Sequence, residues 1–274
     1  MADSWFLFEN IFEDGTLTAD EEAAGFPVSN TTDWREETSY RWKTTDTTSL
    51  KYMTVDLGAG NTANPDTCVI SGHNLFTAGA TILYVRASTD DFAASDVLQG
   101  TFAAPTDDAT IQITFTPTAT DTFRYWRLQL QDPGTWNEVT QLGIVTLGRR
   151  LDFESGFGVR AGLDIYGERF NGNVPINGNG SPLGGNLRFV DKSFNLDISN
   201  PGMTTTNFFD KAAPNFNTTF RDHARQMKPF WYAWNTDTDA RAVYLSWTDG
   251  YQQPFEFITT RRGLRMTLKA RVIV

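Results

Sequence analysis

The chain has few of the residues that most often carry covalent cross-links or metal chemistry. Its 274 residues include one cysteine and two histidines. A single cysteine excludes an internal disulfide framework and is typical of folding in a reducing compartment. The two histidines, His73 and His223, are too far apart to form a recognised zinc pattern with Cys68. The sequence therefore predicts no bound metal and no cofactor.

The sequence also lacks a long hydrophobic run and an excess of positive charge. No segment reaches the ~20 apolar residues of a membrane helix, and the N-terminus has no basic region of the kind that opens a signal peptide. The formal net charge is −10, which disfavours binding to nucleic-acid phosphates. We expect neither membrane insertion nor a nucleic-acid partner.

The charge that is present is unevenly distributed. Residues 1–30 hold seven acidic residues and no Lys or Arg, whereas residues 221–274 hold nine basic residues against five acidic ones. Such a chain can pair the acidic end of one copy with the basic end of the next. Ordinary solvated surface explains the same pattern, so both interpretations stay open.

Alternation of apolar and polar residues is the dominant pattern in the sequence. It occurs in the segments 110–116, 123–130 and 264–274. In the second of these, Trp126, Leu128 and Leu130 alternate with polar or half-polar neighbours. This period is typical of half-buried antiparallel strands, and Gly-, Asn- and Pro-rich turns separate the segments. The sequence predicts a mostly β protein, a sandwich or jelly roll.

One segment has helical periodicity instead. Phe216, Phe220, Ala224 and Met227 fall on one face of a helix near 216–227 that stops before Pro229. The apolar run "FWYAW" that follows is its expected packing partner.

The composition changes near residue 148. We predict a β-sandwich over residues 1–148, with an acidic N-terminal arm, and a β-rich domain over residues 149–274. The second domain contains the uncharged segment 171–186, which holds five Gly and five Asn and is predicted to be a long loop that limited proteolysis cuts first. It lacks the Gly-Lys-Ser/Thr ending of a phosphate-binding loop.

The possible catalytic residues do not form a recognisable set. A thiol nucleophile needs an imidazole base beside it. Cys68 lies in the strand-like run "TCVI" and His73 in a turn, which favours scaffold roles for both. Paired carboxylates of a glycoside hydrolase cannot be identified from spacing alone. We therefore predict that the protein is not an enzyme.

Four tryptophans lie among polar or turn residues, at positions 34, 42, 136 and 231. Aromatic rings on the loops of a β-sandwich stack on sugar rings or anchor protein interfaces, and they also pack in cores. Trp34, Trp136 and Trp231 are the candidate residues for sugar or interface contacts.

The first half resembles the discoidin family, whose members are galactose-binding-like jelly rolls. The resemblance covers residues 25–148 and rests on four short motifs in order, Arg41-Trp42, Asp56-Leu57-Gly58, the turn Ser88 to Asp90, and the strand Tyr125 to Leu128. It implies that the segments 52–57 and 68–71 are core strands. Secreted members close the module with a disulfide, for which Cys68 has no partner. Ligand contacts in the family lie in variable loops, so no sugar-contact residue carries over.

"AGFPVSN" and "GHNLFTAGATI" on either side of "VDLG" are similar to domains of bacteriophage tail proteins. This resemblance implies a structural virion protein of the tail tip, a distal-tail or minor tail protein assembled in the bacterial host cytoplasm. The implied partners are copies of itself, in a ring such as a trimer or hexamer, together with the tail tube and other tail-tip proteins. A carbohydrate-binding module that contacts host-surface glycans is the alternative, and a glycoside hydrolase has the least support.

Overall fold

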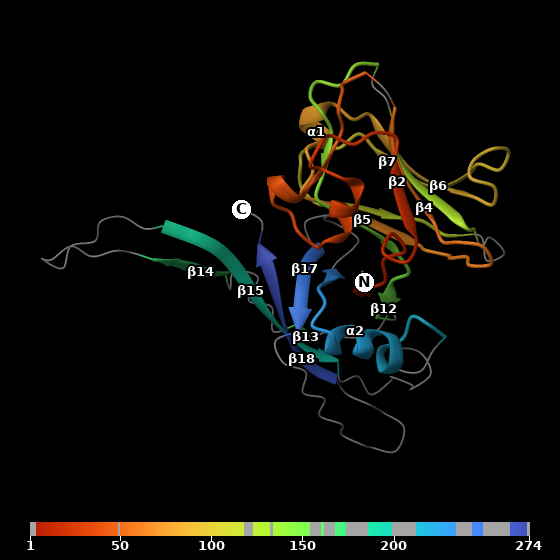
Figure 1. The fold of residues 1–274 in the computed structure, drawn as a ribbon. Coiled ribbons are helices and arrows are strands. Elements are labelled where there is room, and N and C mark those ends of the chain that lie inside the picture. The colour runs from red at the N-terminus through yellow and green to blue at the C-terminus, as the bar shows by residue number, and fades with distance from the viewer. Residues whose placement is uncertain are drawn as a thin grey trace, which may run out of the picture. The chain divides into compact units, whose positions relative to one another are not determined.

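The chain forms two compact units. A computed structural model describes residues 4–48, 50–117, 123–131, 134–153, 160–161, 168–173, 186–198, 212–233, 243–248 and 264–272. One unit, called here the module, consists of residues 9–150. The other, called the flanking unit, combines residues 1–8 with residues 151–274. Figure 1 shows strands as the main element of both units.

The module contains a five-stranded antiparallel sheet in the order β2-β4-β9-β6-β7 and a three-stranded sheet in the order β11-β5-β8, and β10 pairs with β3. Its strands are β2 (Thr16–Ala19), β3 (Trp42–Lys43), β4 (Lys51–Asp56), β5 (Thr67–Ser71), β6 (Ile82–Ser88), β7 (Val97–Ala103), β8 (Ile111–Thr114), β9 (Tyr125–Leu130), β10 (Gln141–Leu142) and β11 (Ile144–Gly148). Its short helices are η1 (Val28–Thr32), η2 (Thr38–Tyr40) and α1 (Leu75–Ala78).

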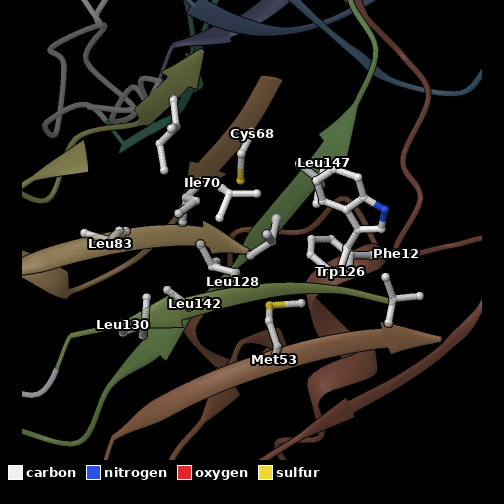
Figure 2. Close-up of a cluster of buried hydrophobic side chains, with 14 of the residues drawn as sticks. Phe12, Met53, Cys68, Ile70, Leu83, Trp126, Leu128, Leu130, Leu142 and Leu147 are labelled. Carbon is white, nitrogen blue, oxygen red and sulfur yellow. The ribbon is translucent and has the colours of Figure 1, made fainter. Parts of the chain in front are cut away.

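Two of the alternating segments, 110–116 and 123–130, contain the strands β8 and β9 of the module, as predicted. Trp126, Leu128 and Leu130 of β9 are buried, whereas the residues between them are half-exposed. One apolar cluster joins side chains from both sheets, which makes the module a two-layer sandwich. Figure 2 shows Cys68 pointing into this cluster beside Ile70 and Leu147.

The segments 52–57 and 68–71 are core strands, as the family resemblance implied. Val55 is fully buried and Leu57 nearly so. Every residue of β5 is buried: Cys68 and Ile70 join the apolar cluster, and Val69, which points to the opposite face, is buried as well. A strand covered on both faces loses the alternation that marks a half-buried one, which explains why "TCVIS" has no period of two.

The flanking unit contains one antiparallel sheet in the order β12-β1-β16-β17-β18-β15-β13, with β14 also paired to β15. Its strands are β1 (Trp5–Leu7), β12 (Leu151–Asp152), β13 (Arg160–Ala161), β14 (Glu168–Asn173), β15 (Asn186–Ile198), β16 (Phe230–Ala233), β17 (Val243–Thr248) and β18 (Leu264–Val272). In the part of the chain that the structure describes, no helix is long and apolar enough to span a membrane.

The N-terminal residues are not an arm on the module. Trp5, Phe6 and Leu7 are fully buried, and the strand they form pairs with β12 on one side and β16 on the other. The module is therefore inserted between β1 and β12 of the flanking sheet, and the division falls after Arg150. The free energy gained by burying three large apolar side chains exceeds what the segment would gain by staying in solvent with its acidic neighbours.

The predicted helix is present but shorter and less regular. A π-helical turn, η3 (Phe216–Phe220), leads into α2 (Arg221–Arg225). Phe220 packs on Phe230 of β16 with ring centroids 5.0 Å apart, so the expected partner is confirmed. Met227 does not belong to the apolar face. It is 64% exposed and has φ 56°, which ends the helix.

The Gly- and Asn-rich segment falls mostly outside the described residues. Its first residues, 171–173, complete β14, and its last, Asn186, begins β15. The rest, 174–185, lies outside the described ranges, and its sensitivity to proteolysis stays a prediction. The C-terminal alternation forms β18, in which Met266, Leu268 and Ala270 are buried.

Candidate ligand-binding site

Hydrogen bonds and a cation–π contact hold side chains from three separate segments of the module, and this set is called here the loop network. The segments are 35–41 around η2, 71–77 between β5 and α1, and 107–110 before β8. The network comprises Arg35, Glu36, Tyr40, Arg41, Ser71, His73, Phe76, Asp108 and Thr110.

Gly72 allows the first two segments to approach each other. Its φ of +64° lies in the left-handed region that favours glycine, and a Cβ at this position would lie 3.1 Å from Cβ of Glu36. The turn after β5 therefore brings the backbone against Glu36, which is only 7% exposed.

A chain of two hydroxyl groups leads to the buried Glu36 side chain. Ser71 Oγ donates a hydrogen bond to Glu36 Oε1. Because this uses the only proton of Ser71, the 2.9 Å contact between Ser71 and Thr110 has Thr110 Oγ1 as its donor. Arg41 adds a further link, since its Nε donates to the backbone oxygen of Glu36 at 3.0 Å. The hydrogen bond from Ser71 offsets part of the cost of burying the Glu36 side chain.

His73 is a neutral structural residue of this network. Its Nδ1 accepts a hydrogen bond from Leu75 N–H at 3.2 Å, and its Nε2 lies 2.7 Å from Ala109 O. A carbonyl oxygen only accepts, so Nε2 carries the proton. Burial lowers the pKa of His73, against the opposing effects of Ala109 O and the Asp108 carboxylate.

Asp108 fixes the start of α1 from another loop. Its Oδ1 accepts from Phe76 N–H at 2.8 Å and from Thr77 N–H at 3.3 Å, and the Thr77 hydroxyl donates to its Oδ2. These N–H groups have no partner within the first turn of a helix. The result is a fixed backbone beneath Phe76, whose side chain is 51% exposed.

The other exposed ring of the network is Tyr40, which is 42% exposed. The guanidinium carbon of Arg35 lies 4.5 Å from the centroid of this ring. The neighbouring Arg41 is partly buried, and desolvation lowers its pKa while the charges of Glu36 and Asp108 oppose that effect. The network thus presents aromatic faces and guanidinium groups that a buried polar layer holds in place.

This arrangement is suited to recognition of a ligand with both apolar and hydroxylated faces. Exposed rings such as Tyr40 and Phe76 offer stacking surfaces, and the side chain of Arg35 offers hydrogen-bond donors. The buried groups between Glu36 and Thr110 satisfy one another, which limits the ordering that binding requires.

The four tryptophans singled out in the sequence differ in their exposure to solvent. Trp34 is half-exposed, has φ 57°, and donates from Nε1 to Glu13 Oε1 at 2.8 Å. It precedes Glu36 by two residues and thus borders the loop network. Trp42, Trp136 and Trp231 are 0%, 2% and 1% exposed, so core packing is the alternative that holds for them. Their rings pack in hydrophobic interiors, which leaves no face for a sugar.

Cys68 and His73 do not form a nucleophile and base pair. The Cys68 thiol is enclosed in the core, and burial raises its pKa to about 12. A thiol with this pKa is not a thiolate at neutral pH, and both ring nitrogens of His73 already bond to backbone. Over the described residues, no group of three or more His, Cys, Asp or Glu side chains is placed to hold a metal ion.

The sequence did not reveal the loop network. The sequence predicts a turn at His73, and nothing in the spacing of Glu36, Ser71 and Thr110 shows that they meet. The available signal was an apolar residue, Phe76, directly after a turn. For ligand contacts, exposed aromatic residues of any type beside turns are better candidates than tryptophans alone.

The two packed antiparallel sheets define the module as a jelly-roll sandwich, and the whole chain as mostly β. Among solved structures, similar ones include chitosan-binding module 1 of a chitosanase/glucanase from Paenibacillus sp. IK-5, at 20% identity over 51% of this chain and 98% of that one, with a TM-score of 0.40. The lectin domain of lectinolysin complexed with Lewis B antigen gives 19% identity, 52% and 96% coverage and a TM-score of 0.40.

A third similar structure contains the CBM32-1 and CBM32-2 domains of Clostridium perfringens ZmpB, at 14% identity over 53% of this chain and 36% of that one, with a TM-score of 0.41. No protein-family model and no curated protein matches the chain.

Proposed function

We propose that the module is a non-catalytic carbohydrate-binding module and that the loop network is its ligand-binding site. The observation that carries the proposal is the exposure of Tyr40 and Phe76 on segments that hydrogen bonds from Arg41 and Asp108 hold in place. Sugar rings have an apolar face that stacks on aromatic side chains and hydroxyl groups that pair with charged ones.

The rings of Tyr40 and Phe76 contribute the stacking energy, and Arg35 orients the sugar hydroxyls. Asp108 supports the site by fixing the backbone of Phe76. Glycan binding by such a site depends on preorganisation, because a flat and solvated ligand gains little from burial alone.

A glycan array tests this function with the full chain and with Tyr40→Ala and Phe76→Ala. Each substitution removes a stacking surface, so we expect about a tenfold loss of affinity, which corresponds to ~1.4 kcal/mol. Trp34→Ala belongs in the same series, since Trp34 borders the network.

Leu98→Ala is the matched control, because Leu98 is 50% exposed on β7 and lies outside the network. It is expected to leave glycan binding unchanged. Unaltered binding by both Tyr40→Ala and Phe76→Ala, or no binding to any glycan, would contradict the proposal.

We further propose, on the resemblance to tail proteins, that the whole chain is a structural component of a virion tail tip. The insertion of the module between β1 and β12 supports this reading, since both of its ends continue into strands of one sheet. In such a protein the flanking unit joins neighbouring copies into a ring, and the module contacts glycans of the host surface.

Native mass spectrometry combined with negative-stain imaging tests the assembly role at low and moderate salt. A closed ring that weakens with salt supports it, because contacts between acidic and basic ends are screened by ions. A monomer at every protein concentration and salt tested would count against self-assembly and leave the glycan-binding function in place.

A further inference from the structure

The outer face of the five-stranded sheet carries a second group of aromatic and charged side chains. On its three central strands, Gln129 of β9 lies between Tyr52 of β4 and Tyr84 of β6. One pair further along, Arg127 lies between Thr54 and Arg86. Outer faces of antiparallel sheets are ordinarily solvated and polar, and here the face combines two tyrosines with two arginines.

Arg127 is held between two aromatic rings. Its guanidinium carbon lies 3.8 Å from the centroid of the Phe92 ring and 4.3 Å from that of the Tyr52 ring. Its Nε donates to Thr54 Oγ1 at 2.9 Å. These three contacts fix both the plane and the rotation of the guanidinium. We call Arg127, Tyr52, Thr54 and Phe92 the arginine clamp.

The loop that supplies Phe92 is held in an unusual conformation. Asp91 and Phe92 have φ values of 58° and 62°, and consecutive non-glycine residues in this region are rare, most of all for a bulky side chain. Ser88 Oγ accepts from Phe92 N–H at 2.8 Å, and the Asp90 carboxylate accepts from the N–H groups of Ala94 and Ser95. Strain that the surrounding bonds maintain in this way is common at binding sites.

The terminal nitrogens of Arg127 are available for a ligand. Within the described ranges, Thr54 is the one hydrogen-bond partner of its guanidinium, and no carboxylate forms an ion pair with it. The neighbouring Arg86 differs, since Asp96 binds it through two bonds of 2.7 and 2.8 Å. Two arginines opposite each other in a sheet repel, and an anion at Arg127 removes that repulsion.

We propose that the arginine clamp binds the carboxylate of an acidic sugar residue, such as a uronic acid. A planar guanidinium pairs with a carboxylate through two parallel hydrogen bonds, and its half-exposed position admits a ligand from solvent. Tyr84 and Gln129 on the same face provide a stacking surface and hydrogen-bond partners for the sugar ring. The inference rests on the proposed function in one respect, that the ligand is a glycan.

Asp91 supplies a way to raise the affinity. Its carboxylate acts favourably on the Arg127 charge without forming an ion pair with it, so it competes with an incoming anion. Asp91→Asn removes the competing charge, and asparagine tolerates the left-handed conformation. We expect this variant to bind an acidic glycan about two- to fivefold more tightly. A purely structural role for the clamp gives no such gain.

The test uses the full chain on an array with matched acidic and neutral glycans, followed by calorimetry with tetragalacturonate, its methyl ester and sodium acetate. We expect acidic members to bind better, with an affinity that falls as salt rises. Arg127→Gln and methyl esterification are each expected to weaken binding about tenfold, and Arg127→Lys to restore it only in part, because the ammonium lacks the planar fork.

Lys43→Gln is the matched control. It removes one positive charge and one cation–π contact, with Phe26 at 3.9 Å, at another place in the module. A melting temperature within a few degrees of the wild type establishes that each variant is folded. Equal binding of acidic and neutral glycans, or Arg127→Gln binding as the wild type does, overturns the inference. Acetate that binds as tightly as tetragalacturonate shows a simple anion site and overturns it too.

The experiments test the two proposals independently of each other. Loss of all glycan binding in Tyr40→Ala and Phe76→Ala, with Arg127→Gln unchanged, supports the proposed function and rejects the clamp. Selective loss of acidic glycans in Arg127→Gln, with Tyr40→Ala and Phe76→Ala unchanged, supports the clamp and rejects the loop network as the binding site.

Discussion

The loop network and the arginine clamp use the same residue types in opposite ways. In the loop network, buried polar groups satisfy one another and leave the rings of Tyr40 and Phe76 exposed. In the clamp, the rings of Tyr52 and Phe92 are occupied in holding Arg127, and its terminal nitrogens remain available. The first site offers apolar faces on a polar support, and the second offers a charge on an aromatic support.

Because of this difference, substitutions are expected to change mainly stability in the loop network and mainly ligand binding in the clamp. The groups that stabilise the loop network are hidden, so substituting them costs unfolding free energy. Those of the clamp lie at the surface, where cation–π contacts contribute only about 0.5–1 kcal/mol each. Stability measurements therefore test the first site most strongly, and ligand measurements test the second.

Glu36→Ala is expected to have the largest effect on stability. It removes the acceptor of the Ser71 hydroxyl and opens space against Gly72. Loss of a partner for a buried polar group costs about 1–3 kcal/mol, which denaturant unfolding measures. Glu37→Ala is the control, since Glu37 is exposed and surface substitutions usually stay within about 0.5 kcal/mol. Equal stability of the two variants would show that the network does not support the fold.

His73 makes the stability of the loop network depend on pH. Because burial lowers its pKa from 6.5, the unfolded chain binds a proton before the folded chain does. The contribution of His73 to stability is complete above pH 6.5 and declines as the pH falls below that value.

His73→Gln isolates this contribution. Glu9, whose pKa burial raises to about 7, acts with the opposite sign, since a raised carboxyl pKa costs stability as the pH rises from 4.5 towards 7. His223 also has a pKa lowered by burial. Both groups remain in the variant, so the difference in unfolding free energy between wild type and variant reports His73. This difference should shrink between pH 8 and pH 5, and a constant difference would contradict the assignment.

The smallest expected effect comes from glycine at the two strained positions of the clamp loop. Asp91→Gly relieves a left-handed conformation without removing the ring and is expected to add about 0.5 kcal/mol of stability. Phe92→Gly relieves the same strain but loses the contact with Arg127, so we expect a net loss. Opposite signs at adjacent residues of nearly equal φ would confirm that the Phe92 ring, not the backbone, is what the loop supplies. Equal signs would contradict it.

Several strands of both units could be predicted from the sequence, because local periodicity reports a half-buried strand directly. The alternation of Trp126, Leu128 and Leu130 identified β9, and that of Met266, Leu268 and Ala270 identified β18. Cys68 was correctly placed in the core. In each case the property depends on which residues lie two positions apart along one strand.

Other features depend on contacts between distant residues. Trp136 follows a turn but is buried, because its backbone N–H donates to Thr47 O and its ring joins the core of the module. Met227 fits the helical period but lies past the end of the helix. Trp5 to Leu7 look like part of an acidic arm but pair with strands more than 140 residues away.

By itself, the sequence determined that this protein is mostly β, that its single cysteine is structural, and where several of its strands lie, since these follow from composition and from a period of two. Only the tertiary structure decided that the N-terminal strand belongs to the flanking sheet, that Glu36, Ser71 and Thr110 meet, and that Arg127 lies between two rings. The physical reason is that the register of strand pairing decides which side chains become neighbours. Strand pairing brings together side chains from segments far apart in the chain, and no local pattern records which of them become neighbours.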